Sequence, residues 1–136
     1  MQGDEPPRSA TKRILIVEDN ELNMKLLRDV LKAYGYTTIT TEKGIAALTL
    51  AREHRPDLIL LDLQLPDISG FDALRRLKDD DETRHIPVVA VTAFAMAGDE
   101  RKALASGCDG YVAKPILLRK FLDVVEKFVG KVDETQ

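Results

Sequence analysis

The sequence predicts a single α/β domain in which a parallel sheet of five strands carries helices on both faces. Two observations predict this fold. Short apolar runs alternate with helical patterns five times along the chain, and most of these runs are continuously apolar. Continuous apolar runs are typical of strands buried on both faces of a parallel sheet. The crossover connections between such strands are right-handed and place helices on both faces, which gives a doubly wound architecture.

Five short runs are predicted as strands. Four of them are continuously or almost continuously apolar, whereas the run at 37–41 is more polar and suits the edge of a sheet. The predicted strands are residues 13–17, 37–41, 58–61, 88–91 and 111–113.

A helical pattern follows each predicted strand. In the first and last of these patterns, apolar residues recur at three- and four-residue spacing, and a glycine (Gly35 or Gly130) provides the stop. Three shorter helices are predicted at residues 45–54, 71–78 and 99–106. The repeating apolar positions are Met24, Leu27, Leu31 and Tyr34 in the first helix, and Leu118, Phe121, Leu122, Val125, Phe128 and Val129 in the last.

Length and composition restrict the possible functions. The 136 residues allow one domain, which we expect at 12–130, between a disordered leader at 1–11 and a polar tail at 131–136. The net charge of −3 gives no reason to expect binding to nucleic acid or to an anionic membrane. No apolar run approaches the roughly 20 residues that span a bilayer. Cys108 is the only cysteine, so an internal disulfide is impossible, and we expect a buried thiol in a cytoplasmic protein.

Polar residues stand where four of the predicted strands end. In a parallel sheet, ligands bind at the carboxyl ends of the strands, so these side chains should converge. They are Glu18 and Asp19 after the first strand, Asp62 after the third, Thr92 after the fourth, and Lys114 with Pro115 after the fifth.

The chemistry of this set indicates phosphoryl transfer to a carboxylate. Three carboxylates close together repel one another unless a cation is present, and Mg²⁺ prefers such oxygen ligands. A carboxylate can act as the nucleophile and form an aspartyl phosphate. Lys114 can supply a positive charge to the phosphoryl oxygens, and Thr92 can donate a hydroxyl hydrogen bond.

With these residues placed, the chain from 12 to 130 resembles the receiver domain of bacterial two-component response regulators, a CheY-like fold. The segments that carry the resemblance are ILIVEDN (14–20), PDLILLDLQLPDISG (56–70), PVVAVTA (87–93) and GCDGYVAKP (107–115). The resemblance implies the strand order 2-1-3-4-5. Segments 17–27 and 85–96 are more similar to single-domain response regulators of alphaproteobacterial cell division.

The resemblance also implies a role for each site residue. Asp62 is the implied phosphoacceptor. Asp19, Asp62 and the backbone carbonyl of Gln64 are implied Mg²⁺ ligands, with Glu18 acting mainly through a bound water. Thr92 and Lys114 would contact the phosphoryl group, and the peptide before Pro115 is expected to be cis.

Three further positions have implied regulatory roles. In the family's switch, Thr92 moves toward the phosphoryl group and Tyr111 turns inward. Gln64 and Phe94 occupy the positions that tune the lifetime of the phosphoryl group, and we expect the apolar Phe94 to shield it from water. The apolar segment 94–97 either packs locally or forms part of a partner surface.

The expected function is that of a signalling protein rather than an enzyme. A histidine kinase or histidine phosphotransferase would donate the phosphoryl group, and a protein target would contact the face formed by the fourth helix, fifth strand and fifth helix. The chain would be a monomer or a weak phosphorylation-dependent dimer. With no output domain expected after residue 130, the signal would pass through protein contacts alone.

Two alternative functions fit parts of this pattern. A phosphorylation-independent pseudo-receiver usually lacks one of the acidic residues, the threonine or the lysine, and all are present here. A haloacid-dehalogenase-type phosphatase needs a second aspartate two residues after the nucleophile, where this chain has Gln64, which cannot transfer a proton. His54 and His85 are expected to be surface residues, because neither follows the carboxyl end of a predicted strand.

Overall fold

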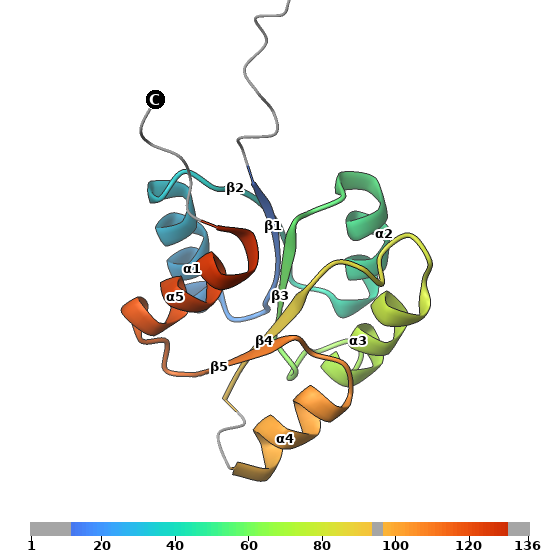
Figure 1. Ribbon diagram of the computed structural model, residues 1–136. Helices are drawn as coiled ribbons and strands as arrows, with labels where there is room; N and C mark the ends of the chain where they lie inside the picture. The colour runs from blue at the N-terminus through green and yellow to red at the C-terminus, as the bar shows by residue number, and fades with distance from the viewer. Residues whose placement is uncertain (1–11, 94–96, 131–136) are drawn as a thin grey trace, which may run out of the picture.

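Strands and helices alternate along the chain in the computed structural model, which describes residues 12–93 and 97–130 (Figure 1). The predicted leader at 1–11 and tail at 131–136 lie outside the described residues. The elements are β1 (Arg13–Val17), α1 (Glu21–Ala33), β2 (Thr37–Thr41), α2 (Gly44–His54), β3 (Leu58–Leu61), α3 (Gly70–Asp79), β4 (Val88–Thr92), α4 (Ala97–Ala105), β5 (Gly110–Ala113) and α5 (Leu118–Val129).

The five strands form one parallel sheet in the order β2-β1-β3-β4-β5, which confirms the predicted fold class. Three of the four neighbouring strand pairs end level with each other at their carboxyl ends, whereas β4 continues for two residues beyond the end of β3. Val17 at the end of β1 is level with Leu61 at the end of β3, and Thr92 at the end of β4 is level with Ala113. The residues that directly follow β1 and β3 are therefore brought side by side.

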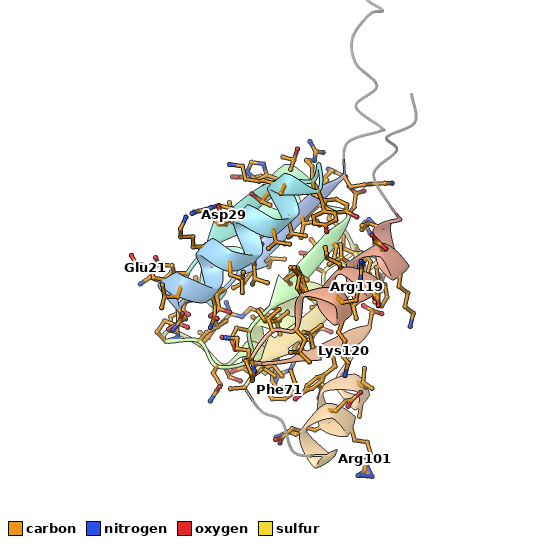
Figure 2. All side chains as sticks on the ribbon, turned by 90° about the vertical axis from the view of Figure 1, so that its left-hand side faces the viewer. Glu21, Asp29, Phe71, Arg101, Arg119 and Lys120 are labelled. Carbon is orange, nitrogen blue, oxygen red and sulfur yellow. The ribbon has the colours of Figure 1, made fainter. Side chains whose placement is uncertain are left out.

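Side chains that alternate along the strands divide the core into two layers. On one face, Ile14 and Ile16 of β1 pack in a cluster with residues of α1 and α5. On the other face, Leu15 and Val17 pack in a cluster that includes residues of α2, α3 and α4. Figure 1 shows α1 and α5 on one side of the sheet and α2 and α3 on the other, and Figure 2 shows α1 and α5 as neighbours. Because both faces are covered, the strand ends are the part of the sheet open to a ligand.

The element boundaries agree with prediction to within about three residues, but two positions of the apolar helical patterns do not lie in the core. Tyr34 follows the last residue of α1 and is exposed, because the helix ends at Ala33 and the chain turns at Gly35 with φ of 93°. Tyr36 is buried in its place and donates a hydrogen bond to the Gly130 carbonyl at 3.0 Å. Leu118, in the first turn of α5, is also exposed rather than part of the core.

Other predictions about single residues are confirmed. Cys108 is buried, and burial is the main cause that raises the pKa of its thiol to about 11. His54 and His85 are exposed. None of the described helices is long and apolar enough to cross a membrane.

Candidate functional site

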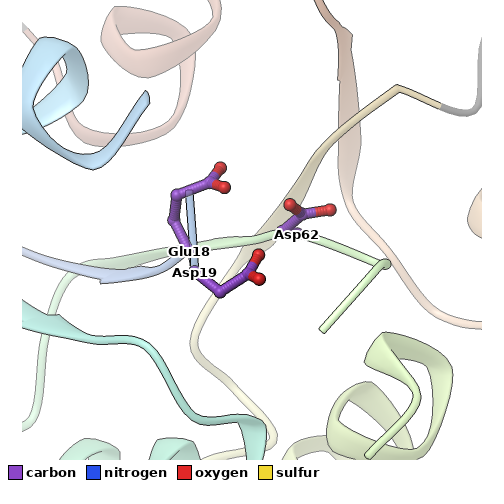
Figure 3. Close-up of side chains that lie close together, drawn as sticks. All are labelled: Glu18, Asp19 and Asp62. Atoms are coloured by element: carbon purple, nitrogen blue, oxygen red, sulfur yellow. The ribbon is translucent and has the colours of Figure 1, made fainter. Parts of the chain in front are cut away.

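Three carboxylates converge at the carboxyl edge of the sheet, as the topology predicted. Glu18 and Asp19 follow β1 and Asp62 follows β3, and one carboxylate oxygen from each lies within 4.8 Å of the other two (Figure 3). Glu18 and Asp62 are buried, with exposed fractions of 1% and 3%, whereas Asp19 is exposed. The cluster therefore has two carboxylates inside the protein and one at its opening.

Backbone hydrogen bonds extend the sheet into this cluster. The Asp62 N–H donates to the Val17 carbonyl at 3.0 Å, and the Glu18 N–H donates to the Thr41 carbonyl at 3.0 Å. Both acidic residues therefore begin their loops with backbone that is still tied to a neighbouring strand. This attachment fixes where their side chains start.

Two loop amides hold the orientation of the buried carboxylates. The Asn20 N–H donates to Glu18 Oε2 at 3.1 Å, and the Gln64 N–H donates to Asp62 Oδ1 at 2.9 Å. Each bond closes a short local turn between residues two apart. The carboxylates are thereby oriented by backbone groups, which cannot swing away as a long side chain can.

Lys114 joins the two buried carboxylates from the other side. Its Nζ lies 2.8 Å from Asp62 Oδ2, 3.1 Å from Glu18 Oε2 and 2.9 Å from Glu18 Oε1. The side chain is only 14% exposed. Its backbone N–H donates to the Thr92 carbonyl at 2.9 Å, and the peptide between Lys114 and Pro115 is cis, as the resemblance implied.

The site carries more negative than positive charge. Burial is the main cause that raises the pKa of Glu18, although its hydrogen bond with Lys114 acts the other way. Burial alone would lower the pKa of Lys114, but the hydrogen bonds to Asp62 and Glu18 outweigh it and the pKa is raised. One ammonium therefore faces three carboxylates, which leaves two negative charges unbalanced.

One buried oxygen also lacks a hydrogen bond. Glu18 Oε1 has none among the described residues, because its contact with Lys114 Nζ, although short, is poorly directed for one. An unsatisfied oxygen beside two further carboxylates is a fitting environment for a divalent cation with a preference for oxygen ligands, such as Mg²⁺.

The remaining predicted residues lie in β4, in β5 or outside the described residues. Thr92 is buried and is the last residue of β4, rather than the first residue after it. Tyr111, in β5, is half-buried, and its hydroxyl is enclosed with no hydrogen-bond partner among the described residues. Burial is the main cause that raises the pKa of Tyr111, followed by Asp99 and Glu100 of α4. Phe94 lies outside the described residues.

Three residues that support the site were missed at the sequence level. Asn20 caps α1 by accepting a hydrogen bond from the Asn23 N–H at 2.9 Å, a role that its place before the helix could have suggested. Gly70 allows a close approach of backbone, because a Cβ there would lie 2.3 Å from Leu63 Cα. Asp67 accepts hydrogen bonds from the distant α2, which local sequence could not reveal.

The chain is similar in sequence to known proteins. The family model of the response regulator receiver domain matches residues 14–126. The polar-differentiation response regulator DivK of Brucella anthropi is 58% identical over 119 residues, which cover 88% of this chain and 97% of that protein. Because the match covers almost all of that protein, it confirms the predicted similarity to a single-domain response regulator.

Two solved structures are also similar. The first is the receiver domain of sensor histidine kinase PA1611 from Pseudomonas aeruginosa, described with a magnesium ion coordinated in the active site cleft. It is 32% identical with a TM-score of 0.81, and the match covers 89% of this chain and 99% of that one. The second is from the Saccharomyces cerevisiae co-crystal of the histidine phosphotransfer protein Ypd1 and the receiver domain of Ssk1. It is 30% identical with a TM-score of 0.80, and the match covers 87% and 88% of the two chains. The chain therefore belongs to the response regulator receiver domain family.

Proposed function

We propose that this chain is a response regulator of two-component signalling that accepts a phosphoryl group on Asp62. The observation that carries the proposal is the placement of the Asp62 carboxylate. It is buried, it contacts Lys114 at 2.8 Å, and it stands beside Glu18 and Asp19 at the open edge of the sheet. A carboxylate held in this way can attack phosphorus without a general base, because it is already the conjugate base of its acid.

The transfer itself forms one bond and breaks one. A carboxylate oxygen of Asp62 attacks the phosphorus of a phosphohistidine, the P–N bond breaks, and the electron pair stays on the imidazole nitrogen of the donor. The product is an aspartyl phosphate. Because phosphoryl transfer depends mainly on positioning and on charge neutralisation, the fixed orientation of Asp62 by the Gln64 N–H supports this role.

Lys114 and Thr92 contribute contacts to the phosphoryl group in this proposal. Lys114 is already within hydrogen-bond distance of Asp62, so its ammonium can pair with the incoming phosphoryl oxygens. Thr92 ends the adjacent strand β4 and is bonded through its carbonyl to the Lys114 backbone. Its hydroxyl would donate to a phosphoryl oxygen from that strand end.

The same site would hold Mg²⁺. Asp19, Asp62 and the backbone carbonyl of Gln64 would bind the ion directly, and Glu18 would act mainly through water. The ion would neutralise the charge that the phosphoryl group adds to an already acidic site. The surplus of carboxylates and the magnesium ion described for the Pseudomonas neighbour support this assignment.

The phosphoryl donor would be a histidine kinase or a histidine phosphotransferase. Large apolar side chains are exposed on two elements that begin next to the site: Leu22 and Leu26 on α1, and Leu117 and Leu118 where α5 begins. Leu22 is 79% exposed. Exposed apolar side chains beside a polar site suit the docking of a protein partner, and the yeast neighbour was crystallised with a histidine phosphotransfer protein.

The signal would leave through the face formed by α4, β5 and α5. Tyr111 lies in β5 and its hydroxyl is enclosed without a hydrogen-bond partner among residues 12–93 and 97–130, which supports a role as the residue that changes position with Thr92. Phosphorylation would then favour one of two arrangements of this face. Gln64 and Phe94 remain the predicted lifetime-tuning residues, and association in a weak phosphorylation-dependent dimer remains a prediction.

In this function, the chemistry of the chain consists of its own phosphorylation and dephosphorylation. The expected location is the cytoplasm, where a free cysteine such as Cys108 is ordinary.

Intact-mass measurement with Mg²⁺ and acetyl phosphate tests the proposal. We expect the native chain to gain one phosphoryl unit, roughly 80 Da, and the Asp62→Asn variant or the chelated protein to gain none. Asp57→Asn is a matched control, because Asp57 directly precedes β3, at the opposite end of that strand from Asp62, and should leave the gain unchanged. No gain from either acetyl phosphate or a phosphorylated histidine donor would reject phosphotransfer and favour the pseudo-receiver.

A further inference from the structure

Helix α2 begins without a cap of its own. Lys43 stands at the N-cap position and provides no side-chain hydrogen bond to the described first turn. The first turn of a helix leaves backbone N–H groups without intrahelical partners, and an Asp, Asn, Ser or Thr usually satisfies them locally. Here the local sequence provides no such residue at the cap.

Asp67 supplies the missing cap from a different part of the chain. Its Oδ1 accepts a hydrogen bond from the Gly44 N–H and its Oδ2 accepts one from the Ile45 N–H, both at 2.9 Å. These bonds lower the pKa of Asp67, although burial, the largest single influence, acts to raise it. A carboxylate at this position also interacts favourably with the positive end of the helix dipole.

The contact between the two segments is close as well as polar. Leu65, two residues before Asp67, and Ile68, directly after it, lie against the start of α2. A Cβ on Gly44 would come within 2.9 Å of the side chains of both. The loop that follows β3 is therefore held against α2 by two hydrogen bonds and by apolar packing around a glycine.

The same loop carries the proposed metal site at its other end. Asp62 opens the loop and Gln64, two residues later, donates its N–H to the Asp62 carboxylate. The loop closes where the Gly70 N–H donates to the Leu63 carbonyl at 3.1 Å. Asp67 lies between these two points and is the only residue of the loop whose side chain bonds α2 among the hydrogen bonds of the described residues.

We propose that Asp67 is a positioning residue that links the start of α2 to the cation site by holding the loop between Asp62 and Gly70. This inference rests on the proposed function, since it concerns the ion that Asp62 and the Gln64 carbonyl would bind. The linkage is reciprocal: if the Asp67 cap favours ion binding, ion binding must stabilise the cap. Both directions can be measured.

Amide hydrogen exchange read by NMR tests the first direction. With saturating Mg²⁺, exchange of the Gly44 and Ile45 amides is expected to slow by about 5-fold relative to chelated protein. The Arg13 amide is an internal control, because it donates to the Asp57 carboxylate at 2.9 Å at the opposite end of the sheet. If the Gly44 and Ile45 rates change no more than the Arg13 rate, the linkage is absent.

Calorimetric titration of Mg²⁺ into variants tests the second direction. Asp67→Ala is expected to weaken binding about 5-fold, and Asp67→Asn, which keeps one oxygen acceptor, is expected to restore much of the loss. Asp57→Ala is the matched control, since it also removes a carboxylate that binds a backbone amide, and it should bind as the native chain does. The NMR spectrum of each variant verifies that it is folded.

The outcomes separate this inference from the proposed function. Native protein that fails to bind Mg²⁺ contradicts the proposed function itself. Native protein that binds Mg²⁺ with an affinity equal to that of folded Asp67→Ala contradicts only the role of Asp67.

Discussion

Each end of the parallel sheet holds a largely buried lysine, and the two lysines have very different surroundings. At the amino end, Lys78 is 22% exposed and donates to Asp109 Oδ2, to the Ile86 carbonyl and to the Arg84 carbonyl, at 3.0, 3.0 and 3.3 Å. At the carboxyl end, Lys114 is 14% exposed and contacts only carboxylates, those of Glu18 and Asp62, among the side-chain bonds of the described residues.

The charge balance differs in the same way. One carboxylate, Asp109, faces Lys78, and it also accepts a hydrogen bond from the Val88 N–H at 2.8 Å. At the other end, one ammonium faces three carboxylates and an oxygen of Glu18 is left without a hydrogen bond within the described structure. At the amino end the lysine and its carboxylate therefore balance each other. At the carboxyl end the carboxylates outnumber the lysine, and a bound cation can neutralise the excess.

The largest effect is expected from replacing Lys114, which would break the balance at the carboxyl end. In chelated protein, Lys114→Met should lower the free energy of unfolding by about 3 kcal/mol, because two buried carboxylates lose the ammonium that pairs with both of them. Mg²⁺ should recover much of this loss by taking over the role of the ammonium. Urea unfolding with and without Mg²⁺ measures both values. A loss of the same size under both conditions would contradict the claim that Lys114 and the metal neutralise the same carboxylates.

A smaller effect is expected from the equivalent change at the amino end. Lys78→Met should lower the free energy of unfolding by about 2 kcal/mol, because it removes charge-assisted hydrogen bonds to Asp109 and two carbonyls. The loss should be the same with and without Mg²⁺, since Lys78 pairs with a single carboxylate, Asp109, and lies at the opposite end of the sheet from the carboxylate cluster. The same urea experiment serves as its measurement. If Mg²⁺ restored the stability of Lys78→Met, the two ends of the sheet would not differ in their response to a cation.

The smallest effect concerns a second unsatisfied polar atom. The Tyr111 hydroxyl, like Glu18 Oε1, is buried without a hydrogen-bond partner within the described part of the chain. Tyr111→Phe removes that hydroxyl, so the free energy of unfolding should rise by up to about 1 kcal/mol. Thermal unfolding of the two proteins compares them directly. Destabilisation by 1 kcal/mol or more would indicate that the hydroxyl makes a favourable contact, contrary to the structure.

Sequence reasoning was sufficient for the parts of the fold that depend on local pattern and topology. The continuous apolar runs predicted the strands to within one residue at each end. Parallel pairing then placed Glu18, Asp19 and Asp62 together, because residues after neighbouring parallel strands meet at one edge.

The features that sequence could not provide depend on long-range contacts. Asp67 caps a helix that starts 23 residues earlier in the chain, so its partner could be known only from the folded loop. Tyr34 continues the helical spacing of the first pattern but is exposed, and the turn at Gly35 places Tyr36 in the core instead. That Lys114 pairs with Glu18 as well as with Asp62 could also be known only from the folded structure.

The most direct test of the central claim is the dependence of stability on Mg²⁺, measured by urea unfolding of the native chain and of Asp19→Asn. The native chain should gain about 2.7 kcal/mol when Mg²⁺ is present at 100 times its dissociation constant. At the same Mg²⁺ concentration, Asp19→Asn should gain clearly less, because it removes the exposed carboxylate at the opening of the cluster. No gain in the native chain, or an equal gain in the variant, would contradict a cation site at the carboxyl end of the sheet.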